Sequence, residues 1–126
     1  MKKMKKSVFM LLAIIATIAF SCSKDAKINR RIDGEWKVVS VGGVPLPIDE
    51  SVTFKFIKDD KLTGDGTLTE TWDSGSYTTP FTYTVGSEKI IFVMDGSSEV
   101  LTVLTYEKDK LELIDSDSDV WVLDPK

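Results

Sequence analysis

The chain contains 126 residues, with 16 basic and 20 acidic side chains, one cysteine and no histidine. Without histidine there is no Ser-His-Asp triad and no imidazole metal site, and a single cysteine excludes an intrachain disulfide. The net charge is negative, and this disfavours nucleic acid as a partner because the phosphate backbone is also negative.

Residues 1–21 are typical of an export signal. Four lysines in the first six residues precede an apolar run from Val8 to Phe20, and small residues follow it. This run is too short for a membrane-spanning helix, which needs about 20 apolar residues. Its end, Ala19-Phe20-Ser21-Cys22, resembles a lipobox, and the resemblance implies cleavage after residue 21 and diacylglycerol on Cys22. An uncleaved anchor helix and an ordinary signal with an incidental cysteine are the alternatives.

The predicted mature chain starts at Cys22 and carries 12 basic and 20 acidic residues, because four lysines leave with the signal. Residues 22–32 are polar and lysine-rich, and we expect a lipidated cysteine followed by a short tether. Residues 33–126 then form one domain. Acyl chains on Cys22 would hold the domain at the cell envelope. Ser23 after the cysteine, rather than Asp, resembles a signal for release to the outer membrane.

From Gly34 onward the apolar residues alternate with polar ones, which is the period of a β-strand. The breaks are rich in Gly, Asp, Ser and Pro, and Asp95-Gly96 is a strong hairpin signal. No helical period occurs after Asp33. Eight short strands are predicted, over residues 34–41, 51–58, 66–74, 80–85, 89–94, 99–106, 111–114 and 120–123.

The fold class predicted from this pattern is all-β. Eight strands with tight turns favour an up-and-down meander, and closing it into a barrel removes both exposed edges. A two-sheet sandwich is the alternative, although its crossing loops are usually longer. An eight-stranded barrel has an interior just wide enough for side chains or for one small ligand.

Two motifs resemble those of small lipocalin-like lipoproteins of the Bacteroidetes. Asp33-Gly34-Glu35-Trp36 is similar to their opening G-x-W, and residues 104–113 resemble a hairpin that recurs late in their sequences. The resemblance implies a lipocalin-like barrel in which Trp36 plugs one end. The chain is shorter than true lipocalins, and it lacks the arginine that packs over the tryptophan near their last strand.

Aromatic residues are the main candidates for a binding site. They lie on the alternating apolar faces of the predicted strands, where they either fill the core or line a pocket that is open at one end. Hydroxyl groups on two of them could orient a ligand. The candidate wall of an apolar pocket consists of Phe54, Phe56, Phe81, Tyr83, Phe92 and Tyr106.

The acidic residues give little support for a catalytic or metal-binding site. Most of them lie in predicted turns, and Glu70, within a strand, is expected to point outward. Residues 115–119 read D-x-D-x-D, but Gly and Glu are missing from the sixth and twelfth positions of a calcium loop. We therefore expect no enzyme, no metal and no cofactor.

Two functions remain open. In the first, the protein is an envelope-anchored, lipocalin-like lipoprotein that binds a small apolar ligand. In the second, it is a structural or interaction lipoprotein with a filled barrel that docks to an envelope protein, for which the threonine-rich strand Thr67–Thr71 and Trp72 offer a face. In both, the lipid anchor makes the membrane a partner.

Overall fold

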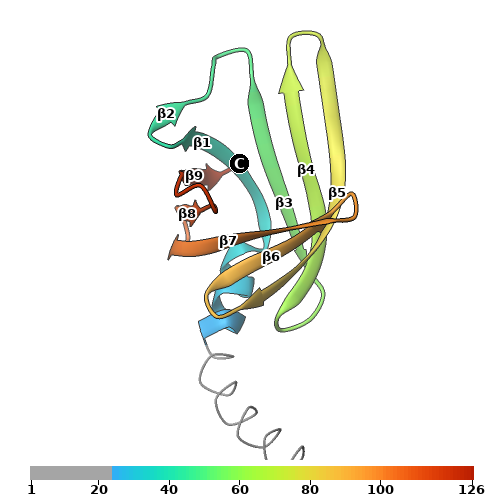
Figure 1. The fold of residues 1–126 in the computed structure, drawn as a ribbon, viewed down its shortest axis with the longest axis vertical. Coiled ribbons are helices and arrows are strands. Elements are labelled where there is room, and N and C mark those ends of the chain that lie inside the picture. The colour runs from blue at the N-terminus through green and yellow to red at the C-terminus, as the bar shows by residue number, and fades with distance from the viewer. Residues whose placement is uncertain (1–23) are drawn as a thin grey trace, which may run out of the picture.

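The structure, a computed structural model, describes residues 24–126; the predicted signal peptide and Cys22 lie outside this range. The described residues form one helix, over residues 24–32, and nine β-strands (Figure 1). The strands are β1 (Gly34–Val41), β2 (Val44–Pro45), β3 (Ser51–Lys58), β4 (Thr63–Trp72), β5 (Gly75–Gly86), β6 (Lys89–Met94), β7 (Ser97–Tyr106), β8 (Leu111–Ile114) and β9 (Val120–Pro125).

The strands close into a barrel. From β3 to β9 each strand pairs antiparallel with the next, while β1 pairs with β3 on one side and with β9 on the other. The two-residue β2 pairs antiparallel with Ser40 and Val41 at the end of β1. The predicted eight-stranded up-and-down barrel is therefore confirmed, and the closing β1–β9 pair excludes the sandwich.

Alternation decides which side chains enter the barrel. Phe54 and Phe56 of β3 are buried, whereas Lys55 between them is exposed, and β5 repeats the pattern. In β1 the pairing with β9 shifts between Val38 and Ser40. An irregularity of this kind changes the face to which later residues point. As a result Val41 packs against the core, whereas strict alternation from Trp36 and Val38 would have placed Ser40 there.

The β4–β5 hairpin is longer than the sequence predicted. Its turn lies at residues 73–74, and β5 runs through residues 75–79, which lie between the predicted strands 66–74 and 80–85. Pairing of β5 with β6 begins only at Phe81, directly after Pro80, which has no N–H to donate. The outer half of the hairpin is therefore paired only within itself and with β3, and together with that end of β3 it projects beyond β6 and β7 (Figure 1).

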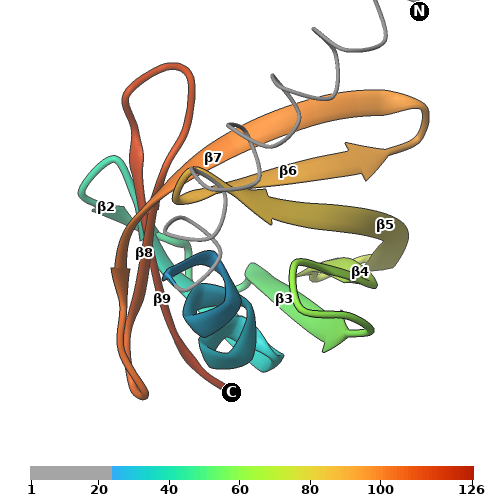
Figure 2. The ribbon, with the colours of Figure 1, turned by 90° about the horizontal axis from the view of Figure 1, so that it is seen from below.

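The predicted tether is wrong for residues 24–32, which form a helix that closes one end of the barrel (Figure 2). Ile28 and Ile32 belong to the core and are fully buried, as is Asn29, and Asp25 is nearly so. These positions are spaced i, i+3, i+4 and i+7 and lie on one face of a helix. Within residues 24–126, no helix combines the length and apolar character needed to cross a membrane.

Candidate ligand-binding site

The two ends of the barrel differ in how they are closed. The helix (residues 24–32) covers the end at which β1 begins, together with the connections 59–62, 87–88 and 107–110. Because successive strands are antiparallel, the connections 42–50, 73–74, 95–96 and 115–119 gather at the opposite end. We call these the closed end and the mouth.

Buried hydrogen bonds hold the helix against the closed end. The Asn29 amide donates to the backbone oxygens of Asp60, Lys61 and Thr63 at 2.9, 3.1 and 3.2 Å. Its Oδ1 accepts the Tyr83 hydroxyl at 2.7 Å. Because Tyr83 is buried, and because acidic side chains lie near it, its pKa is raised above the ordinary value, and the hydroxyl stays neutral. This hydroxyl is therefore committed to the fold and does not orient a ligand.

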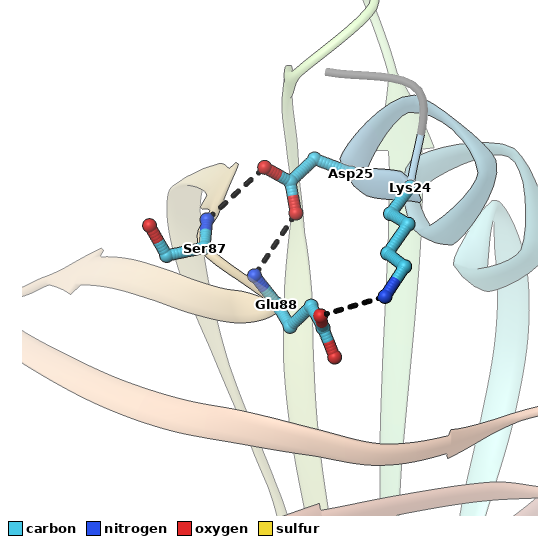
Figure 3. Close-up of polar contacts among 4 residues, drawn as sticks. All are labelled: Lys24, Asp25, Ser87 and Glu88. Carbon is cyan, nitrogen blue, oxygen red and sulfur yellow. Dashed lines mark hydrogen bonds and ion pairs between the residues drawn. The ribbon is translucent and has the colours of Figure 1, made fainter. Parts of the chain in front are cut away.

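Asp25 joins the helix to the turn between β5 and β6. Its carboxylate accepts the backbone N–H of Ser87 at 3.0 Å and that of Glu88 at 2.9 Å (Figure 3). Both turn residues have positive φ, which directs their N–H groups to one side. Lys24 adds an exposed ion pair with Glu88, at 3.4 Å. Asp25 thus ties the first turn of the helix to the barrel.

Trp36, for which the resemblance to lipocalin-like lipoproteins implies a plug at one end, also lies at the closed end. It is buried, and its indole N–H donates to the backbone oxygen of Ile32 at 2.9 Å, the last residue of the helix. Among the described residues, every buried side-chain nitrogen or oxygen has a hydrogen-bond partner. The helix and Trp36 therefore close this end of the barrel, and their buried polar groups are fully hydrogen-bonded.

Five of the six predicted wall residues pack against one another and do not surround a common cavity. The ring centroids of Phe81 and Phe92 are 5.0 Å apart, and those of Phe56 and Tyr83 are 5.4 Å apart. Phe54 lies 5.9 Å from Phe92. These spacings are those of aromatic rings in direct contact. The sixth residue, Tyr106, is partly buried against the core at the closed-end terminus of β7. Aromatic side chains therefore fill the part of the barrel nearest the closed end.

A cavity of about 330 Å³ remains at the mouth. Phe54 and Phe92, two of the predicted residues, contribute to its lining. Its other apolar lining residues are Leu68, Met94, Leu101 and Trp121, and its polar ones are Asp95, Ser97, Glu99 and Asp115. Sequence reasoning missed most of this set, although the signal was present: the apolar members continue the inward-facing pattern to the mouth ends of their strands.

Asp115 is fixed in the rim of this cavity. Its Oδ2 accepts the Trp121 indole N–H at 2.9 Å, and its Oδ1 accepts the backbone N–H groups of Asp117 and Asp119, both at 2.9 Å. These hydrogen bonds, chiefly the one from Trp121, lower the pKa of Asp115 below its ordinary value. Residues 115–119 therefore form an acidic turn organised by Asp115, and residues 24–126 contain no metal-binding cluster of three or more Asp, Glu, His or Cys side chains.

The outer surface carries a separate set of apolar residues. Ile91, Val93, Val100 and Leu104 are exposed on β6 and β7, and Trp72 and Tyr77 are exposed on the projecting hairpin. Thr69 and Thr78 share a hydrogen bond of 3.1 Å between their hydroxyls across β4 and β5. Thr67 and Thr69 are partly buried, and Glu70 is exposed, as expected.

Comparison with known proteins finds no family model that matches the sequence and no curated protein with significant similarity to it.

Proposed function

We propose that this protein is a lipocalin-like lipoprotein of the cell envelope whose barrel mouth binds a small apolar molecule without catalysis. The observation that carries the proposal is the cavity of about 330 Å³ with a largely apolar lining. It lies at the end of the barrel opposite the helix (Figure 1). Ligand sites are typically concave and mostly apolar, with volumes of about 300–1,000 Å³. The volume suits a ligand at the small end of that range.

The arrangement of the closed end supports anchoring at an envelope membrane, which we propose is the outer membrane. The described residues begin with this helix at residue 24, two residues after Cys22 in the sequence. Lys24, Lys27, Arg30 and Arg31 are exposed on this helix and suit an anionic headgroup layer. A lipid on Cys22 would therefore place the closed end toward the membrane and the mouth away from it.

Anchoring is tested by comparing the wild-type protein with Cys22→Ser in the native host. We expect wild-type protein in the detergent-soluble membrane fraction, with the mass of an acylated mature chain. Cys22→Ser should lack the acyl mass. An unmodified Cys22 in the wild-type protein would refute the lipoprotein proposal.

Binding is tested by native mass spectrometry of the protein purified from its own envelope. We expect an additional small mass that is lost on denaturation. Leu68→Trp, which fills the mouth cavity, should lose that mass, whereas Leu104→Trp on the outer surface should keep it. If the wild-type protein carries no extra mass and acquires none when apolar molecules are offered, the proposal fails.

An interaction protein is the second candidate, favoured by the exposed apolar residues of β6 and β7. Ile91 and Val100 are directly opposite each other on these strands, and both are exposed. Such a patch is typical of surfaces that bind other proteins. Photo-crosslinkers at these two positions should capture one envelope protein if this function is correct, and a crosslinker at Lys37 provides a control on β1.

A further inference from the structure

The described charges are divided unevenly between the two ends of the barrel. The mouth connections with their adjoining strand ends cover residues 42–54, 66–81, 92–101 and 113–123. These ranges contain nine Asp and Glu residues and no Lys or Arg. Neither of the two ion pairs formed within residues 24–126 involves them, since both pairs lie at the closed end. The mouth is therefore an uncompensated acidic rim around an apolar cavity.

The lining of the cavity combines buried apolar residues with acidic ones. Phe54, Phe92 and Leu101 are buried residues of its lining, while Asp95, Glu99 and Asp115 supply three carboxylates and no basic residue is present. Ser97, Glu99 and Leu101 alternate with Ser98 and Val100, so Glu99 lies on the inward face of β7. An ion at such a boundary is less screened than one on an open surface, because part of its surroundings is apolar.

The carboxylate of Asp115 is already ordered before any ligand arrives. Three N–H groups hold it, and the same hydrogen bonds keep it ionised. Trp121, which donates one of these bonds, also lines the cavity, and indole is the aromatic side chain that attracts cations most strongly. Preorganised groups of this kind cost little entropy on binding.

We propose that the mouth binds a small amphipathic cation, in which an alkyl or single-ring aromatic body carries a primary or substituted ammonium group. The body would occupy the apolar lining, and the ammonium group would lie among Asp95, Glu99 and Asp115. A cavity of about 150 Å³ is enough for benzene, so the volume here, about 330 Å³, admits one ring or a short chain with its headgroup. The acidic rim would repel fatty acids and other amphipathic anions.

The inference rests on the proposed binding function, and a matched set of probes separates the two. Octylammonium, 1-octanol and octanoate share one chain and differ in headgroup charge. Isothermal titration calorimetry at pH 7 and low salt would use residues 22–126 with Cys22→Ser, which keep the helix and every described core residue. We expect octylammonium to bind about tenfold more tightly than octanol, and octanoate to bind more weakly than both.

The outcomes distinguish failure of the cationic class from failure of apolar binding itself. If octanol binds but octylammonium binds no more tightly, apolar binding stands and the cationic class is wrong. If octanoate binds most tightly, the inference is overturned outright. If none of the three binds, the proposed function and the inference both fail.

Paired variants test whether the rim, and not the net charge, selects the cation. Glu99→Gln should weaken octylammonium binding several-fold and leave octanol unchanged, because it removes one carboxylate of the cavity lining. Glu107→Gln removes the same charge from a connection at the closed end and should change neither. Equal losses in both variants would show attraction to the whole acidic protein and would overturn the site.

Discussion

The buried hydrogen bond between Asn29 and Tyr83 should make the helix an integral part of the barrel. In Asn29→Ala the Tyr83 hydroxyl loses its partner at a site that is 2% exposed. An unsatisfied buried polar group costs about 1–3 kcal/mol. The backbone oxygens of Asp60, Lys61 and Thr63 lose the amide as well, but they lie near solvent, so their loss adds about 1 kcal/mol. We expect a total loss of about 2–4 kcal/mol in the free energy of unfolding.

A double-mutant cycle isolates the pair. Tyr83→Phe alone leaves Asn29 Oδ1 unsatisfied, whereas the combined variant removes both partners, so the two losses should overlap by about 1–2 kcal/mol. Urea unfolding followed by tryptophan fluorescence provides the measurement. Thr69→Val with Thr78→Val, which removes a more exposed hydroxyl pair, should show little coupling. Strictly additive losses for Asn29 and Tyr83, or a change below about 0.5 kcal/mol for Asn29→Ala, would refute the structural role of this bond.

Three further predictions concern the closed end. Gly64→Ala should cost about 1–3 kcal/mol, because the new methyl group would meet the Tyr83 ring and a backbone oxygen of β3; Gly86→Ala, which meets nothing within 4 Å, should be nearly neutral in the same denaturant titration. Asp25→Asn should destabilise the fold by about 1–2 kcal/mol and move the turn amide signals in NMR spectra, while Asp109→Asn should do neither. Because burial raises the pKa of Tyr83 from its ordinary 10.0, unfolding releases its proton above that pH, so stability should fall with rising pH from pH 10 upward; Tyr83→Phe should show a shallower alkaline loss, and identical slopes would contradict this origin.

Strand identity followed from local pattern because each strand buries one face. The alternation around Phe54 and Phe81 is visible in any short window of the sequence, and tight turns left few ways to connect the strands. The break in β1 was not visible in this way. It arises from pairing with β9, more than 80 positions along the chain, and so reflects tertiary structure.

The helix was missed because half of its buried face is polar. Asp25 and Asn29 share one helix face with Ile28 and Ile32. Only the two isoleucines are apolar, and two residues are too few to produce a recognisable apolar periodicity. The partners that make these polar residues buriable, the turn at Ser87 and the hydroxyl of Tyr83, are more than 50 residues away. Only the folded barrel brings them together.

The candidate site was predicted in kind but placed too deep. The aromatic residues of the predicted wall are inward-facing, as expected, but their rings on β3, β5 and β6 are in contact and fill the barrel. The cavity lies between these rings and the mouth, where Leu68, Met94 and Leu101 line it. Which inward residues touch one another and which border empty space depends on barrel diameter and on the closing helix, neither of which a strand pattern contains.

The central claim, that a small apolar molecule binds at the mouth, is tested most directly by an NMR titration of the methyl-labelled protein with 1-octanol. Binding at the proposed site should shift the methyl signals of Leu68, Met94 and Leu101 in a saturable manner and leave those of Ile28 and Leu111, at the closed end, unchanged. The absence of saturable shifts, or shifts centred on Ile28 and Leu111, would contradict the claim.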